Sequence, residues 1–264
     1  MKEFATGYSR ISLWYESIGD WKAATISLTR PDSRNCIDET MAEEIREACR
    51  RLNEDEECRL VTVTGTGDFF SAGRTRVDGG EGSPAERMER LKVADSLASL
   101  LMPVLIVLNG DALGHGLELA LAGDLRICSE AAHLALWEPG QSAVLWDGGT
   151  QRLPRLVGTA WALDMALTGR NLNGTEALRI GLVNRVFSTS ELETAARDLA
   201  EQVLAAAPIA ARYAKEAVKK GMDLSLDQGL RLEADLSVIL LSTDDRSEGL
   251  ASFKERRQPR FTGM

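Results

Sequence analysis

The stretch MPVLIVLNGDALGHGLELALAGDLR, residues 102–126, decides the fold of this chain. Its apolar run, residues 104–108, is rich in β-branched side chains and stands between a proline and Asn-Gly, which predicts a buried strand. Gly114-His115-Gly116 then leads into a run of Leu and Ala that predicts a short helix. Glycines let a backbone approach a ligand closely, and the first N–H groups of a helix attract negative charge. This strand, turn and helix are therefore either ordinary packing or a binding site.

Two carboxylates stand out by their surroundings. Glu118 is the polar residue of the otherwise apolar helix, and Glu138 stands between Trp137 and Pro139. A buried carboxylate is costly unless it is hydrogen-bonded or used in chemistry. Two carboxylates in one apolar cavity have pKa values that are raised and pushed apart, so one can hold a proton while the other accepts one. Adding water to a double bond needs such a pair, whereas the alternative is that each forms a salt bridge with an arginine.

The composition is that of a soluble globular protein, with 264 residues, 44% hydrophobic, 27% charged and a formal net charge of −9. The basic residues do not form a block, so nucleic acid and anionic membranes are poor candidate partners. The apolar runs fall short of the roughly 18 residues that span a bilayer, and the first residues do not resemble a signal peptide. We expect a cytoplasmic protein. Four cysteines without C-x-x-C spacing and two histidines favour reduced structural thiols and no metal centre.

The remaining pattern predicts a mixed half followed by a helical third. We expect a β-hairpin around Gly19-Asp20, a helix over residues 38–53 begun by Asp38, a strand over residues 59–64 and a helix over residues 85–101. The three glycines in residues 77–84 predict a mobile loop. Beyond residue 160 the chain is predicted to be nearly all helical. The turns at residues 71–75 and 114–116 are rich in small residues, and each can present a backbone N–H to a carbonyl oxygen that becomes an enolate.

Several motifs occur in the order found in the enoyl-CoA hydratase/isomerase, or crotonase, superfamily, which this chain resembles over nearly its whole length. They are Arg30-Pro31 with Asn35, Phe70-Ser71-Ala72-Gly73, Asn109-Gly110 through Gly114-His115-Gly116 to Glu118, Gly148-Gly149-Thr150-Gln151-Arg152-Leu153, Thr168-Gly169 with Gly181-Leu182-Val183, and Glu248-Gly249 with Phe253, Arg256-Arg257 and Phe261.

The resemblance implies an α/β fold built as a spiral of β-β-α units. It implies a core with the active site over residues 1–195, and a helical C-terminal region over residues 196–264 for oligomerisation and for covering the active site. A homotrimer or a dimer of trimers is implied, with an acyl-CoA thioester as substrate. Coenzyme A is then part of the substrate, and no separate cofactor is expected.

The same resemblance assigns roles to particular residues. The backbone N–H groups of Arg74 and His115 would form the oxyanion hole, and Glu118 and Glu138 would be the two catalytic glutamates. The substrate would contact Ala72, Gly73, Gly114, Trp137, Trp146 and Arg256. The family's contacts with the adenosine end of coenzyme A sometimes come from a neighbouring subunit, which is the reason for including Arg256.

The chain departs from the hydratase pattern at three places. Arg74 stands where hydratases usually have a small residue, His115 replaces a glycine, and Ser142 and Trp146 stand where the usual loop has glycines. The His115 side chain is either hydrogen-bonded and turned into the protein, or it assists the oxyanion or acts as a base.

Hydration of an enoyl-CoA is therefore the leading hypothesis. The alternatives are an isomerase, a decarboxylase, or a β-diketone hydrolase that cleaves a carbon-carbon bond with His115. A non-enzymatic, RNA-associated member is a further alternative, and the net charge of −9 argues against it.

Overall fold

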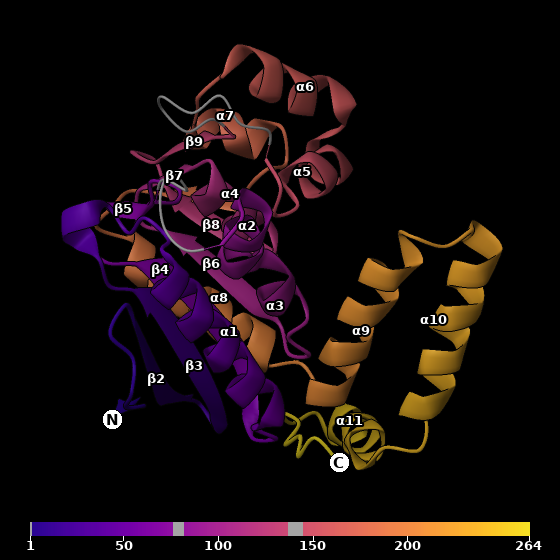
Figure 1. Cartoon of the computed structure of the whole chain (residues 1–264). Coiled ribbons are helices and arrows are strands. Elements are labelled where there is room, and N and C mark those ends of the chain that lie inside the picture. Colours follow the sequence, from indigo (N-terminus) through magenta and orange to yellow (C-terminus); the bar gives the residue numbers. More distant parts are fainter. Residues whose placement is uncertain (1, 76–81, 137–144) are drawn as a thin grey trace.

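The computed structural model describes residues 2–75, 82–136 and 145–264, and its centre is a seven-stranded sheet (Figure 1). The strand order is β1-β2-β3-β4-β6-β8-β11. These strands are β1 Glu3–Phe4, β2 Ile11–Ile18, β3 Trp21–Leu28, β4 Cys58–Gly65, β6 Val104–Leu108, β8 Leu125–Ser129 and β11 Arg185–Phe187. The first three pair antiparallel and the rest pair parallel. Parallel pairing requires crossovers, and the intervening helices supply them.

A second sheet of short strands has the order β10-β9-β7-β5. Its strands are β5 Phe69–Ser71, β7 Asp111–Leu113, β9 His133–Ala135 and β10 Leu172–Asn173. The chain alternates between the two sheets, because β4, β6 and β8 of the first sheet are each followed directly by β5, β7 and β9 of the second. With the helices between them, these pairs form the predicted spiral of β-β-α units. All residues of β6 are buried, so the predicted central strand is confirmed.

The other local predictions are mostly confirmed. The hairpin of β2 and β3 turns at Gly19-Asp20, and the Asp38 side chain accepts the N–H of Met41 at the start of α1. The helices are α1 Glu39–Glu54, α2 Pro84–Leu91, α3 Ala94–Ala98, α4 His115–Leu121, α5 Gly149–Val157, α6 Thr159–Thr168, α7 Gly174–Arg179, α8 Leu192–Leu204, α9 Pro208–Gly221, α10 Leu226–Leu240 and α11 Asp244–Glu255, with a short 3-10 turn, η1, at Pro31–Ser33. The four cysteines are free thiols.

The prediction of one helix over residues 85–101 is wrong, because α2 and α3 are separate helices. Between them, the N–H groups of Val93 and Ala94 both donate to Oδ2 of Asp147, at 2.8 and 2.9 Å. A distant carboxylate therefore caps the start of α3 and interrupts the helical path. Of the glycine-rich loop predicted over residues 77–84, residues 77–81 lie outside the described residues, and Pro84 already belongs to α2.

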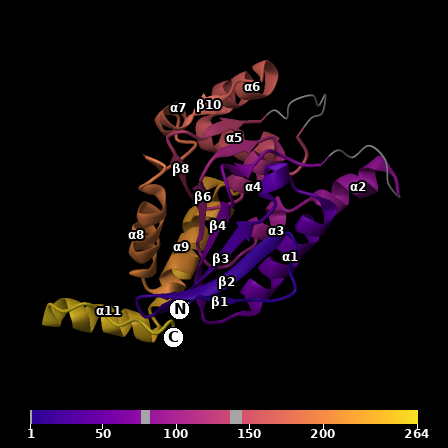
Figure 2. The ribbon, with the colours of Figure 1, turned by 90° about the vertical axis from the view of Figure 1, so that its left-hand side faces the viewer.

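The C-terminal helices differ in how closely they join the sheet. The helix α8 packs on the central sheet, and Leu192, Leu199 and Leu204 are buried there; residue 195 lies within this helix. The helices α9, α10 and α11 lie beside the core rather than over it (Figures 1 and 2). Lys215 and Lys219 of α9 join them to the core through Asp124, at 2.7 and 2.6 Å. Among the described residues, none of the helices is long and apolar enough to cross a bilayer.

Candidate active site

Asn35 fixes the first of the two glycine-containing turns. Its buried side chain donates to the carbonyl groups of Thr66 and Phe69, at 2.9 and 2.8 Å, and accepts the N–H of Arg30 at 2.9 Å. Its φ of 53° is in the left-handed region, which asparagine tolerates better than most residues. In the Arg-Pro…Asn motif, the asparagine side chain therefore hydrogen-bonds three backbone groups and so positions β5 and the turn after it.

The N–H of Arg74 is directed by the backbone pairing of this turn. The N–H of Ile37 donates to the carbonyl of Gly73, and the N–H of Thr75 donates to the carbonyl of Ile37, both at 2.9 Å. In a trans peptide the N–H points opposite to the preceding carbonyl. Since the Gly73 carbonyl points toward Ile37, the N–H of Arg74 points away from Ile37.

The second turn packs directly against the first. A Cβ added to Gly116 would lie 2.4 Å from the carbonyl oxygen of Ser71, so only glycine allows this approach. Gly114 precedes α4 with φ 49° and ψ −118°, and its N–H donates to the carbonyl of Ala135 at 2.8 Å. Because α4 begins at His115, the N–H of His115 lies in the first helical turn, where amides point out of the helix end. The two turns singled out by sequence are therefore neighbours.

Glu118 is buried on α4, and only 1% of its surface is exposed. Its Oε1 accepts the N–H of Asp147 at 2.9 Å and that of Gly149, the first residue of α5, at 2.8 Å. A Cβ on Gly149 would lie 3.0 Å from this oxygen, which explains a glycine there. Burial raises the pKa of Glu118, while the charge of His115 and the two backbone N–H groups oppose that rise. The result is a carboxyl group that keeps its proton to higher pH than usual.

The His115 side chain is turned inward and hydrogen-bonded. Its Nε2 lies 2.9 Å from Oδ2 of Asp147, and each side chain is 1% exposed. Burial alone would raise the pKa of Asp147, but the hydrogen bond and charge of His115, together with the N–H groups of Val93 and Ala94, lower it. Sequence reasoning missed Asp147 as a partner of His115. Its signal was a carboxylate placed directly before the Gly148-Gly149 pair.

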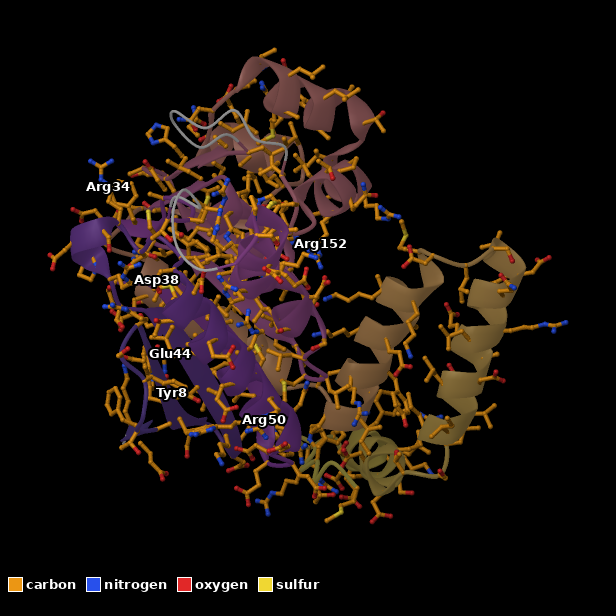
Figure 3. All side chains as sticks on the ribbon, in the orientation of Figure 1. Tyr8, Arg34, Asp38, Glu44, Arg50 and Arg152 are labelled. Atoms are coloured by element: carbon orange, nitrogen blue, oxygen red, sulfur yellow. The ribbon has the colours of Figure 1, made fainter. Side chains whose placement is uncertain are left out.

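Arg152 holds the backbone around Asp147. One guanidinium nitrogen donates to the carbonyl of Asp147 at 2.8 Å, and another pairs with Asp95 of α3. Figure 3 shows Arg152 where α5 meets α3. A Cβ on Gly148 would lie 1.9 Å from the same guanidinium. The Gly-Gly-Thr-Gln-Arg-Leu motif thus combines an arginine with the glycines that make room for it.

An aromatic ring joins the two unusual residues of the site. The guanidinium carbon of Arg74 lies 5.7 Å from the centre of the Trp146 ring, and the rings of His115 and Trp146 are 5.0 Å apart at 43°. Arg74 is 8% exposed, so this cation is buried.

The structure brings together most of the predicted site residues, namely Ala72, Gly73, Arg74, Gly114, His115, Glu118 and Trp146. Trp137, Glu138 and Ser142 lie outside the described residues. Arg256 caps the end of α11, is exposed, and is not brought to the site within this chain, because α11 lies far below α4 and α5 in Figures 1 and 2. Within the described ranges, no group of three or more His, Cys, Asp or Glu side chains is arranged to hold a metal ion.

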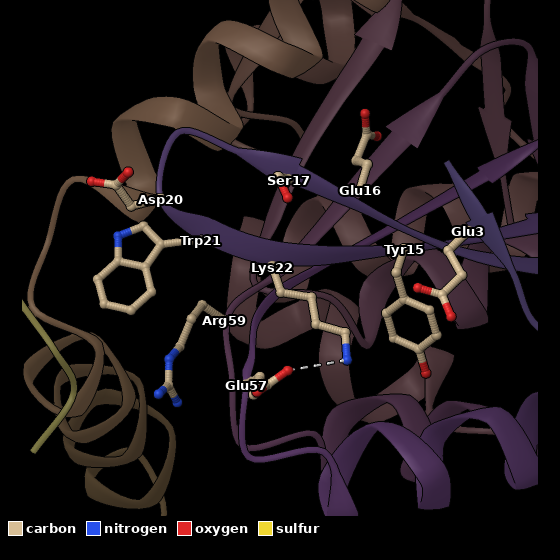
Figure 4. A pocket seen from close by; sticks show the side chains of 9 residues that line it. All are labelled: Glu3, Tyr15, Glu16, Ser17, Asp20, Trp21, Lys22, Glu57 and Arg59. Atoms are coloured by element: carbon tan, nitrogen blue, oxygen red, sulfur yellow. Dashed lines mark ion pairs between the residues drawn. The ribbon is translucent and has the colours of Figure 1, made fainter. Parts of the chain in front are cut away.

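A separate hollow of about 510 Å³ lies at the other end of β4, beside the β2–β3 hairpin (Figure 4). It is bordered by aromatic rings and charges. Lys22 lies 4.5 Å from the ring centre of Tyr15 and pairs with Asp55 at 2.7 Å, and Arg59 lies 5.6 Å from that of Trp21. Arg59 and Gly65 occupy opposite ends of β4, roughly 20 Å apart at the usual rise per residue. The hollow is therefore remote from Glu118.

Known proteins resemble this chain over nearly its whole length. The family described as enoyl-CoA hydratase/isomerase matches residues 21–264. The chain is 36% identical over 268 residues to human enoyl-CoA hydratase domain-containing protein 2, mitochondrial, covering 98% of this chain and 92% of that one. It is also 36% identical over 245 residues to (E)-benzylidenesuccinyl-CoA hydratase of Thauera aromatica, covering 91% and 95%.

A solved structure, the enoyl-CoA hydratase from Bacillus anthracis, superposes with a TM-score of 0.91 at 36% identity, covering 97% of this chain and 100% of that one. The chain therefore belongs to the enoyl-CoA hydratase/isomerase family, within the crotonase superfamily, and is an enzyme of that family.

Proposed function

We propose that the protein is an enoyl-CoA hydratase-like lyase, which adds water across the α,β double bond of an acyl-CoA thioester. The observation that carries this proposal is the buried Glu118 carboxyl group, held by two backbone N–H groups beside the neighbouring turns that bear the N–H groups of Arg74 and His115. The hydratase names of several relatives support it.

In the proposed reaction the thioester carbonyl lies between the N–H groups of Arg74 and His115. Water adds to the β-carbon, and the double-bond electrons move toward the carbonyl oxygen to give an enolate, which the two N–H groups stabilise. The enolate then takes a proton at the α-carbon. One of Glu118 and Glu138 accepts the proton that the water loses, and the other delivers the proton to the α-carbon. No oxidant or separate cofactor is required, and the atoms of one water molecule are retained in the product.

The environment of Glu118 suits proton transfer. Burial raises its pKa, so the protonated form is populated closer to neutral pH than for a solvated glutamate. The N–H groups of Asp147 and Gly149 occupy Oε1, which fixes the carboxyl group in one orientation.

Substitution of each glutamate tests the proposal. We expect Glu118→Gln and Glu138→Gln each to lower kcat for hydration of crotonyl-CoA by about 100-fold or more, since a general acid or base typically contributes on the order of 100- to 10,000-fold. Glu193→Gln, an exposed change in the first turn of α8, is the matched control and should leave kcat within twofold. Full activity in both site variants would refute the mechanism.

A second candidate function is favoured by the buried pair of His115 and Asp147, 2.9 Å apart. A histidine held by a carboxylate can activate water as a base, which is what hydrolytic cleavage of a carbon-carbon bond in a β-diketone requires. His115→Gly distinguishes the two reactions. A hydratase should keep its turnover with glycine at this position, whereas a histidine-dependent hydrolase should lose it. Isomerisation and decarboxylation would be recognised by products of unchanged mass and of mass lower by carbon dioxide.

We also propose that the chain forms a homotrimer or a dimer of trimers through residues 196–264, with Arg256 reaching the adenosine end of a neighbour's substrate. Exposed apolar side chains on α10 and α11, including Leu226 at 78% and Phe253 at 83%, support association through this region. Light scattering on the purified protein tests the assembly. A cytoplasmic location remains a prediction, since the human relative is named mitochondrial; fractionation of the source cells tests it.

A further inference from the structure

The turn that holds Glu118 contains two glycines and one aspartate. Oε1 of Glu118 accepts the N–H of Asp147 and that of Gly149, the first residue of α5. Between these two donors, Gly148 has a φ of 104°, which glycine adopts easily and other residues rarely do. Neither glycine has a side chain that could pack against a neighbour. Of these three residues, Asp147 is therefore the one whose side chain can fix the turn.

The Asp147 side chain ties this turn to the start of α3. It is 1% exposed, and its Oδ2 accepts the N–H groups of Val93 and Ala94 at 2.8 and 2.9 Å. Hydrogen bonds from backbone N–H groups to an ionised carboxylate are short and strong. Because Asp147 also donates its own N–H to Glu118, a shift of the turn relative to α3 would move a donor of the Glu118 carboxyl group.

Arg152 makes a second link between the turn and α3. One guanidinium nitrogen donates to the carbonyl of Asp147 at 2.8 Å, and another pairs with Asp95 of α3. Arg152 thus holds the backbone of the turn, while the Asp147 carboxylate holds its side chain. Two links at different points restrict rotation of the turn, which a single link would allow.

The helix α3 is itself firmly seated and can serve as a fixed reference. Ala94 and Leu97 are fully buried, and α3 packs against α1 and α4. Just beyond α3, the N–H of Leu101 donates to the side chain of Asn53 on α1 at 3.0 Å. The carboxyl group of Glu118 is therefore held between its own helix, α4, and a turn whose position α3 sets.

We propose that Asp147 and Arg152 are positioning residues, which fix the orientation of the Glu118 carboxyl group by holding its backbone donors against α3. The kinetic consequence rests on the proposed hydration, in which Glu118 transfers a proton. Proton transfer needs both partners within hydrogen-bond reach, and a displacement of about 1 Å can lower a rate on the order of 100-fold. His115→Gly leaves both links to α3 in place, so this role is separate from that of the imidazole.

The kinetic test compares variants in two backgrounds, the wild type and Glu118→Gln, with crotonyl-CoA as substrate. Asp147→Ala and Arg152→Gln should each lower kcat at least about tenfold in the wild type, with KM changed less than about threefold. In Glu118→Gln the same substitutions should change the residual kcat less than about twofold, because no carboxyl group remains to be positioned.

Equal losses in both backgrounds would show that Asp147 and Arg152 only stabilise the fold, and would overturn the inference. Unchanged kcat in the wild-type background would overturn it as well. Arg152→Gln removes no buried carboxylate, so it decides the question if Asp147→Ala does not fold.

Two further variants sharpen the test. Asp147→Asn keeps a side-chain oxygen that can accept the N–H groups of Val93 and Ala94, so it should lose less kcat than Asp147→Ala. An equal loss would contradict the role of these two hydrogen bonds. Asp111→Ala is the matched control, because Asp111 also accepts a backbone N–H and pairs with an imidazole, both of His133, at 2.9 and 3.1 Å. It should leave kcat within about twofold, and a loss as large as that of Asp147→Ala would contradict a specific link to Glu118.

A spectroscopic measurement separates this inference from the proposed function. With isotope-labelled glutamate carboxyl groups, the NMR signal of Glu118 is the one that disappears in Glu118→Gln. Its chemical shift should change in Asp147→Ala and Arg152→Gln but not in Asp111→Ala, whether or not crotonyl-CoA is hydrated. An unchanged signal in both site variants would refute the positioning role even if hydration were observed. A displaced signal without hydration would support the positioning role and refute the proposed function alone.

Discussion

The core around Glu118 buries carboxylates that are hydrogen-bonded to the backbone, whereas the helices α9–α11 leave large apolar side chains exposed. In the core, Glu118 and Asp147 are buried and each accepts two backbone N–H groups. In α9–α11 few side chains are buried, and large apolar ones face outward. Glu118 and Asp147 therefore find their hydrogen-bond partners within one chain, whereas the outer helices present apolar side chains that a single chain does not cover.

Adding one methyl group should have opposite effects in the two regions. Gly116→Ala places a Cβ 2.4 Å from the Ser71 carbonyl oxygen, and we expect a loss of at least about 3 kcal/mol in the free energy of unfolding, with loss of activity. Gly229→Ala, within α10, meets nothing closer than 3.8 Å and should stabilise by about 0.5–1 kcal/mol. Urea unfolding measures both, and equal effects would contradict the contrast.

Removing the charge of Asp147 should affect stability and the site together. Asp147→Asn weakens the bonds to His115, Val93 and Ala94, and we expect the free energy of unfolding to fall by about 2 kcal/mol at pH 7. Thermal unfolding followed by circular dichroism would measure it. An unchanged melting temperature would show that this buried pair is not a stabilising element.

The effect of Asp147 should disappear in acid. Its folded pKa lies below the unfolded value of 3.8, so its contribution is fully present above that value and is lost as pH falls through the folded pKa. The stability difference between wild type and Asp147→Asn should therefore shrink below about pH 4. Glu248 of α11 pairs with Arg257, just after the helix, and Arg257 lowers the pKa of Glu248 to about 2, but this pair is partly exposed and screened by solvent. Glu248→Gln should give a much smaller acid-dependent difference in stability than Asp147→Asn. A larger difference would contradict this expectation.

Charging the outer helices should disturb assembly more than folding. Leu226→Glu combined with Phe253→Glu changes exposed side chains, so we expect under about 0.5 kcal/mol in the folding of the single chain. We expect association to weaken at least tenfold, seen as a lower mass in light scattering. Phe4→Glu, on exposed β1, is the control and should not change the mass. An unchanged mass in the double variant would place the subunit contacts elsewhere.

Sequence predicted the elements whose signal is local. The apolar run of β6 and the helical spacing and Asp38 cap of α1 are readable from neighbouring residues. The motifs also identified the two turns and Glu118, since these residue types are set by close backbone approaches such as that of Gly116 to Ser71.

What sequence could not supply depends on contacts between distant residues. The break between α2 and α3 is made by Asp147, more than fifty positions away, and the partner of His115 is the same carboxylate. The short strands β5 and β7 carry too few residues for an alternating pattern and form only by pairing within the second sheet, β5 with β7 and β7 also with β9. The contact of Arg74 with Trp146 likewise required the fold.

Hydration is tested most directly by the mass of the product formed from crotonyl-CoA in water enriched in heavy oxygen. We predict an intact thioester that has gained one water molecule carrying heavy oxygen at the β-carbon, with formation at least about 100-fold slower in Glu118→Gln. Unreacted crotonyl-CoA, together with heavy-oxygen incorporation into a ring-opened cyclic diketone, would contradict hydration and assign the chemistry to His115 and Asp147.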